Sequence, residues 1–228
     1  MHKHHWKAIL YKDLCDLRWN GQILFNLITG VVFVFVFTLI PIRQVPISFL
    51  IAFILGMLTM IMQGNMIVEE HEQRMKRGLI QAGFSIKDIV IEKMLITFMI
   101  TSLVLIALFL FHSDQISYSL STFLLALPML LIILFIGTFI GLKTKNTIEV
   151  SLQGMPVILL YFFVEGLLMN SDRSTMKWLA IFPNYHLHYG IEQINQQQSF
   201  LHFLLVPLLW VVVVILLFIV WLRKREAH

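Results

Sequence analysis

Six long apolar runs are the feature that most constrains this sequence. Each is about 18 residues or longer, close to the length that an α-helix needs to cross the hydrocarbon core of a bilayer. They cover residues 23–40, 47–68, 94–111, 122–142, 150–169 and 203–222. With 58% apolar and 13% charged residues, the chain is too apolar for a soluble domain. The sequence therefore predicts an all-α membrane protein with six transmembrane helices in a single domain.

The basic residues are divided unevenly between the two sides that six spans define. An even number of spans places both termini on one side, and every Lys and Arg except Arg43, Arg173 and Lys177 falls on that side. Short loops rich in Lys and Arg stay in the cytoplasm. We therefore expect a multi-pass protein of the plasma membrane with both termini in the cytoplasm. The net charge of +4 is explained by this orientation, and no nucleic-acid partner is expected.

Residues 1–22 precede the first span and have the pattern of an amphipathic helix. Apolar residues such as Trp6, Leu10 and Leu17 recur at helical spacing, and charged residues occupy the other face. This pattern predicts a helix that lies in the cytoplasmic interface, and a solvated leader is the alternative. The nearby histidines at positions 2, 4 and 5 lack a second cluster of ligands, so no metal site is expected.

The segment 69–93 is the most highly charged part of the chain, with 10 of its 30 charged residues. An acidic run, a basic run and two glycines, Gly78 and Gly83, predict a helix end, a short transverse helix and re-entry into the bilayer at Lys93. We expect this cytoplasmic loop to bind a protein outside the bilayer, and simple solvation is the alternative. The candidate residues are Glu69, Glu70, Glu72, Arg74, Lys76, Arg77, Gly78, Leu79, Gly83 and Lys93.

The external segment 170–202, before the last span, is long and rich in aromatic residues. We expect short helices folded against the outer leaflet, with a break at Pro183, that form a lid or an interfacial anchor. Glu165 is the one acid within a predicted span and is a functional candidate because a charge at membrane depth is costly. The candidates for a translocation path or gate are Asn26, Glu165, Phe182, Pro183 and Tyr185.

Glycine and proline also occur inside two predicted spans. Gly137 and Gly141 form a Gly-x-x-x-Gly pair, which permits a close helix approach and is equally consistent with packing inside the chain. Gly154 and Pro156 are expected to loosen the start of the fifth span.

Two short motifs resemble those of intramembrane metalloproteases of the prenyl-processing type. Glu69, Glu70 and Arg74 form Glu-Glu-x-x-x-Arg, and Phe182 with His186 forms Phe-x-x-x-His. Such an enzyme needs its acids and histidines in one cavity. On the expected topology the two motifs lie on opposite sides of the bilayer, about 30 Å apart. No phosphate-binding loop is present either, so the chain alone is not expected to be an enzyme.

Several segments share a pattern with one family of membrane proteins. They are Lys12-Asp13-Leu14, Asp16-Leu17-Arg18, the run from Glu69 to Arg77, Gly78-Leu79, Ala82-Gly83, Lys93 and Phe182-Pro183-Asn184-Tyr185-His186. In their order along the chain they resemble the transmembrane subunits of type 2 ATP-binding-cassette (ABC) exporters. These subunits have an interfacial helix, six spans, a charged loop after the second span and short external helices before the sixth. The turn at Ala82-Gly83-Phe84-Ser85 departs from that pattern because it lacks a proline.

The resemblance implies the permease subunit of an exporter. A separate ATPase subunit would dock on the segment 69–93 and hold ATP and Mg, and this chain would bind no cofactor. A second permease subunit, identical or different, would complete the path through the membrane lipid. Because the spans carry little charge, we expect an amphipathic or hydrophobic cargo such as a peptide, an antibiotic or a lipid-like molecule. The alternatives are a secondary transporter or channel, and an intramembrane metalloprotease.

Overall fold

The computed structural model describes residues 11, 15, 21–39, 45–72, 75–81, 83–112, 115–170 and 177–226. Every regular element in these ranges is helical, as predicted. The elements are α2 (Gly21–Leu39), α3 (Ile47–Phe53), the π-helical segment η1 (Ile54–Met60), α4 (Ile61–Glu72), α5 (Met75–Gln81), α6 (Ile86–His112), α7 (Ile116–Lys143), α8 (Thr147–Met169), the 3-10 helix η2 (Lys177–Ile181), α9 (Pro183–Asn195), the 3-10 helix η3 (Leu201–Leu204) and α10 (Leu205–Glu226).

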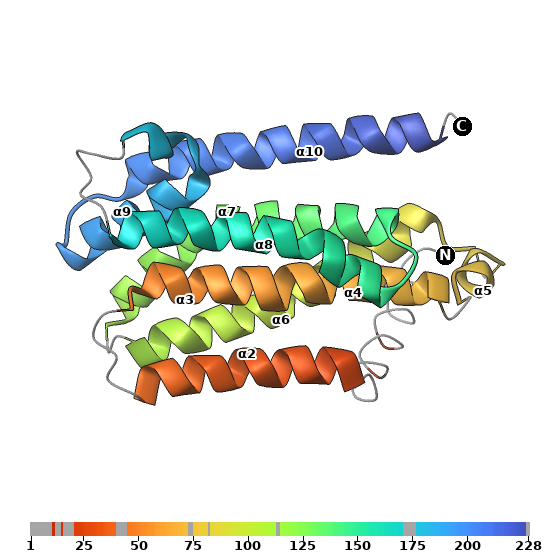
Figure 1. Ribbon diagram of the computed structural model, residues 1–228, viewed down its shortest axis with the longest axis horizontal. Coiled ribbons are helices and arrows are strands. Elements are labelled where there is room, and N and C mark those ends of the chain that lie inside the picture. The colour runs from red at the N-terminus through yellow and green to blue at the C-terminus, as the bar shows by residue number, and fades with distance from the viewer. Residues whose placement is uncertain are drawn as a thin grey trace.

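The long helices lie side by side in a bundle, with α10 along one edge and α2 along the other (Figure 1). In the described part of the chain, five helices are long and apolar enough to cross a membrane: Ile47–Glu70, Ile86–His112, Ile116–Lys143, Thr147–Met169 and Leu201–Trp221. The first predicted span corresponds to α2, a helix of 19 residues with a shorter apolar part at Leu24–Phe33. The all-α membrane fold is therefore confirmed, whereas the count of six spans stays a prediction.

The short elements gather at the two ends of the bundle. One end, which we call the α5 end, holds α5, the start of α6, the turn between α7 and α8, and the end of α10 (Figure 1). The other, the α9 end, holds η2, α9 and η3, which are the short helices expected before the last span. The interfacial helix predicted over 1–22 lies almost entirely outside the described residues. Within this segment, Tyr11 and Cys15 are described, and both are helical and exposed.

Helix α7 lies at the centre of the bundle and packs against α4, α6, α9 and α10. Its two spaced glycines permit the closest of these contacts. A Cβ atom added to Gly137 would lie 2.7 Å from the Met60 carbonyl oxygen, and one added to Gly141 would lie 2.7 Å from the Gly64 carbonyl oxygen. The Gly-x-x-x-Gly pair therefore packs inside the chain, against η1 and α4.

One expectation, a helix break at Gly78, is wrong. Gly78 does not break a helix, because it lies within α5. Gly83 does form a turn, with a φ of 92° that favours glycine. Helix α6 begins at Ile86 and not near Lys93, so Lys93 lies inside it. Helix α8 is continuous through Pro156, so the expected loosening of its first turns does not interrupt the helix.

Candidate functional site

A buried ion pair links two helices at the α5 end. Lys93 Nζ in α6 lies 3.0 Å from Glu70 Oε1 in α4, and each side chain is only 6% exposed. Neighbouring apolar side chains, among them Ile67, Val90 and Leu142, line the same region. Because a buried charge is costly without a partner, the pair holds α4 and α6 in one register.

A capping box starts α6 beside this pair. The backbone N–H of Ser85 donates to Asp88 Oδ2 at 3.0 Å, and the backbone N–H of Asp88 donates to Ser85 Oγ at 3.1 Å. These reciprocal bonds satisfy amide groups that a helix start otherwise leaves unpaired. They place the first turns of α6 directly after the turn at Gly83, which explains why α6 begins before Lys93.

The turn between α7 and α8 is attached to α4 at the same end. The backbone N–H of Thr147 donates to Glu72 Oε1 at 3.1 Å. Asn146 caps α8 by accepting from the backbone N–H of Glu149 at 2.8 Å, and the Glu149 carboxylate accepts from the backbone N–H of Lys145 at 2.9 Å. The polar contacts of the α5 end therefore link α4 to both α6 and α8.

The candidate docking residues divide into buried and exposed groups. Glu70 and Lys93 are buried, and Glu69 is half-buried. Gly78 and Gly83 are exposed, as is Glu72, while Leu79 is half-buried. The backbones of residues 76 and 77 belong to α5, and residue 74 lies outside the described residues. The exposed members of this set therefore lie at the end of α4, in α5 and in the turn after it.

Two further hydrogen bonds between helices lie in the interior of the bundle. Gln63 Nε2 donates to Thr138 Oγ1 at 3.0 Å, and Thr59 Oγ1 donates to Thr101 Oγ1 at 3.1 Å. All four side chains are fully buried. These bonds link η1 and α4 to α7 and α6, so the bundle is fixed by polar contacts as well as by apolar packing.

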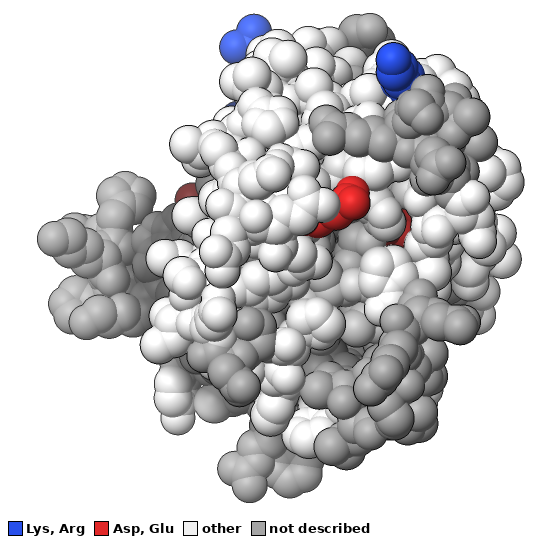
Figure 2. Space-filling view, turned by 90° about the vertical axis from the view of Figure 1, so that its left-hand side faces the viewer, with Lys and Arg blue, Asp and Glu red and all other residues white. Residues whose placement is uncertain are grey.

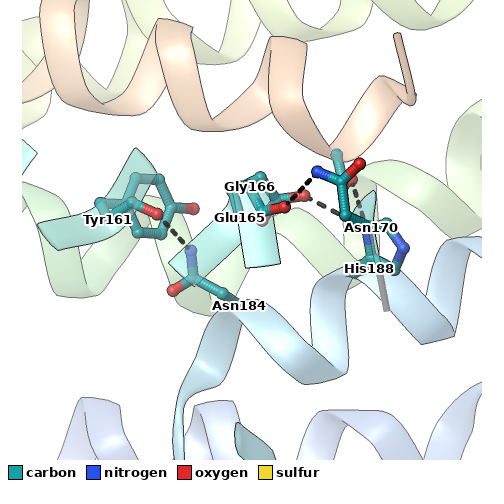
Figure 3. A network of polar contacts seen from close by, with 7 residues as sticks. Tyr161, Glu165, Gly166, Asn170, Asn184 and His188 are labelled. Atoms are coloured by element: carbon teal, nitrogen blue, oxygen red, sulfur yellow. Dashed lines mark hydrogen bonds and ion pairs between the residues drawn. The ribbon is translucent and has the colours of Figure 1, made fainter. Parts of the chain in front are cut away.

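Glu165 lies in a second polar cluster, at the α9 end (Figure 3). It is fully buried, and its Oε1 atom lies 3.3 Å from His188 Nδ1 of α9. The same nitrogen lies 2.9 Å from Ser48 Oγ of α3. Asn184 Nδ2 of α9 donates to the Tyr161 carbonyl oxygen at 3.4 Å. The cluster joins α3, α8 and α9, and no pattern in the sequence indicates that His188 is the partner of Glu165.

The other gate candidates lie in two separate places. Phe182 and Pro183 form the start of α9, with Pro183 buried at its first position. Tyr185 is buried and packs against Tyr189 with their rings tilted and the ring centroids 4.6 Å apart. Asn26 of α2 instead lines a cavity of about 200 Å³ between α2, the α3–η1 segment and α8.

The lining of this cavity does not include the Glu165 cluster. Ile158 is the lining residue of α8 nearest to Glu165, and at about 1.5 Å per residue Glu165 lies about 10 Å further along that helix. The structure therefore brings four of the five gate candidates to the α9 end and leaves Asn26 apart from them.

The two protease-like motifs are separated in the structure. Glu70 lies at the α5 end, and His186 lies in α9 at the other, where its Nε2 atom is 2.8 Å from the Ala180 carbonyl oxygen. In the described ranges, no group of three or more His, Cys, Asp or Glu side chains is placed to hold a metal ion. The geometry therefore does not support the metalloprotease alternative.

A comparison with known protein families identifies one of them for most of the chain. A family model described as "ABC-2 family transporter protein" matches residues 42–222. The chain belongs to this family. As an ABC-2 protein it is a transmembrane permease subunit of an ABC transporter, a class of subunit that works with an ATPase subunit. Comparisons with curated proteins and with solved structures found no significant match.

Proposed function

We propose that this ABC-2 permease belongs to an exporter whose ATPase subunit docks on α5. The observation that carries the proposal is the buried pair between Glu70 and Lys93, together with the bond from Thr147 to Glu72. These contacts link α4, α6 and α8 directly behind α5, which itself packs against α4. If an ATPase displaced α5, the movement would therefore be transmitted to α4, α6 and α8 together.

The sequence of α5 and its flanks supplies the charge for docking. Arg74, Lys76 and Arg77 follow three acidic residues within one short stretch. We expect a triple reversal of these three cations to glutamate to abolish the stimulation of ATP hydrolysis by cargo, because all three charges lie within about one helical turn of the proposed contact. Single reversals should have mild effects, since an exposed ion pair contributes at most about 1 kcal/mol.

The matched control for this prediction is a triple reversal of Arg43, Arg173 and Lys177, the cations predicted on the opposite side. It changes the net charge equally and should leave ATPase coupling intact. Both variants should elute as folded protein on size-exclusion chromatography. Wild-type association and export in the first triple variant would exclude docking at α5.

The proposed orientation places the α5 end in the cytoplasm. Among the described Lys and Arg side chains, Lys177 alone belongs to the α9 end, where most of the described residues are neither acidic nor basic (Figure 2). Cytoplasmic loops carry the excess of basic residues. In a Cys15→Ser background, an impermeant thiol reagent applied to intact cells should label Gln198→Cys and not Lys145→Cys. The opposite labelling pattern would show that the α9 end, and not the α5 end, lies in the cytoplasm.

We propose that a second permease subunit completes the path beside the cavity at Asn26. The α8 side chains Leu152, Leu159 and Phe163 are apolar and exposed. Asn26, Thr29 and Ser151 add a few polar groups at the cavity. Such a surface suits an amphipathic or hydrophobic cargo better than a sugar or an ion. ATPase stimulation by soluble sugars, without any response to amphipathic peptides or hydrophobic drugs, would contradict this cargo class.

The Glu165 cluster is proposed to hold the α9 end closed. Replacing His188 by leucine should lower the free energy of unfolding by about 1–3 kcal/mol, because the Glu165 carboxylate stays buried and loses its partner. It should also raise ATP hydrolysis in the absence of cargo if the cluster restrains opening.

Thermal unfolding in detergent and basal ATPase activity of the assembled transporter measure the two effects. His202→Leu, an exposed histidine at the same end, is the matched control and should change stability by less than about 0.5 kcal/mol. Equal effects of the two substitutions would show that the cluster has no special role.

A further inference from the structure

A deep apolar groove opens on the side of the bundle between α6 and α10, with α7 as its floor. Its volume is about 700 Å³. Buried or half-buried apolar side chains form its interior, among them Phe98 of α6, Leu134 and Phe135 of α7 and Phe218 of α10. The exposed apolar side chains of Ile91, Leu95 and Ile219 form its rim. The lining of this groove shares no residue with the cavity at Asn26 or the Glu165 cluster, and it adjoins the Glu70–Lys93 pair through Val90 and Leu142.

Two cations lie at one end of this groove. Lys87, in the first turn of α6, and Arg223, near the end of α10, both line it and are both exposed. They are the two charged residues of the lining. Lys224 and Arg225 follow Arg223 in the sequence. The groove therefore has a basic mouth at the α5 end and an apolar interior.

The length of the groove matches one leaflet of a bilayer. From Lys87 to Phe98 the α6 helix rises about 16 Å at about 1.5 Å per residue. The hydrocarbon core of a bilayer is about 30 Å thick, so the groove extends through about half of it. A ligand with an anionic head beside Lys87 and Arg223 would place its apolar tail in the interior within the same leaflet.

We propose that this groove binds an anionic phospholipid of the inner leaflet, with its phosphate beside Lys87 and Arg223 and an acyl chain between α6 and α10. Basic pockets between transmembrane helices at the cytoplasmic side are suited to acidic lipid headgroups. The assignment to the inner leaflet rests on the orientation proposed above, whereas the binding chemistry rests on the groove alone.

A second copy of the chain fits the groove less well. A two-fold interface brings the same surface patch of both subunits together. The cations at positions 87 and 223 of one copy would then face the like charges of the other, which is unfavourable. The charge of the mouth therefore favours an anionic lipid over a partner subunit.

The test is native mass spectrometry of the full chain, titrated in detergent with phosphatidylglycerol and, separately, with phosphatidylcholine of the same acyl chains. The wild type should bind phosphatidylglycerol more tightly by about tenfold or more. In the double variant Lys87→Gln/Arg223→Gln that affinity should fall about 25-fold, about fivefold for each cation. Lys143→Gln/Lys145→Gln removes the same charge from exposed positions at the same end, outside the groove lining, and should change the affinity by less than about twofold.

A second pair of variants tests the apolar part of the groove. Leu95→Trp fills the groove while keeping both cations and should weaken the binding of both lipids. Leu103→Trp, at an exposed position of α6 outside the groove, should not. The proposal would be overturned if Lys87→Gln/Arg223→Gln and Lys143→Gln/Lys145→Gln lost the same affinity for phosphatidylglycerol. An unchanged preference for phosphatidylglycerol in Lys87→Gln/Arg223→Gln would also overturn it. A dimer that Leu95→Trp dissociates would assign the groove to a second copy and overturn it as well.

Discussion

Replacing Lys93 by methionine should lower the free energy of unfolding by about 3–5 kcal/mol. The substitution keeps most of the side-chain volume and removes the cation that faces the Glu70 carboxylate at 3.0 Å. Because both side chains are only 6% exposed, water cannot readily solvate the carboxylate that remains. Denaturant or thermal unfolding of the detergent-solubilised chain measures the loss. Since natural proteins are stable by only about 5–15 kcal/mol, the variant should also accumulate poorly.

The double variant Glu70→Leu/Lys93→Met separates loss of the pair from loss of packing. It removes both charges, so most of the stability should return. Lys143→Met, which alters an exposed lysine at the same end, should change the free energy of unfolding by less than about 0.5 kcal/mol. If the double variant were less stable than Lys93→Met, the pair would not be the reason for the destabilisation.

Alanine at both Gly137 and Gly141 should prevent normal packing of α7 against α4 and η1. Each added Cβ would lie 2.7 Å from a backbone carbonyl oxygen, which cannot move aside as a flexible side chain can. We expect each single substitution to cost about 1–3 kcal/mol, and the double variant to lose more or to fail to fold. Expression level and the unfolding transition measure the effect.

Gly166 provides the control for this prediction. It lies in α8, and a Cβ added there would have no neighbouring atom within 4 Å. Gly166→Ala should therefore be neutral, or stabilising by up to about 1 kcal/mol because alanine favours a helix. Normal stability of Gly137→Ala/Gly141→Ala would show that α7 does not pack as closely as described.

The helical membrane fold could be predicted because it depends on local signals. Each apolar run long enough to span a bilayer can be recognised from one continuous stretch of sequence. The same holds for the aromatic residues and Pro183 before the last span. The start of α6 is also encoded locally, in the capping box of Ser85 and Asp88, which lies before the predicted point of re-entry at Lys93.

The contacts of the candidate sites depend on how distant segments pack, which a single sequence does not reveal. Glu165 was a candidate on its own, but its partner His188 is 23 residues away and Ser48 comes from α3. Likewise, the spacing of Gly137 and Gly141 indicated a close approach, but not whether the facing helix belonged to this chain. Lys87 and Arg223 line the same groove although they are 136 residues apart in the sequence.

Site-specific photocrosslinking tests the central claim most directly. A photoreactive phenylalanine analogue is placed at Ile80, which is 45% exposed in α5, or at Gln196, an exposed residue at the α9 end. The two variants are expressed in cells together with the ATPase subunit and irradiated. If the ATPase docks on α5, the Ile80 variant should form a covalent product with the ATPase and the Gln196 variant should not. A product from Gln196 alone, or none from Ile80 in a complex that copurifies intact, would contradict docking at the α5 end.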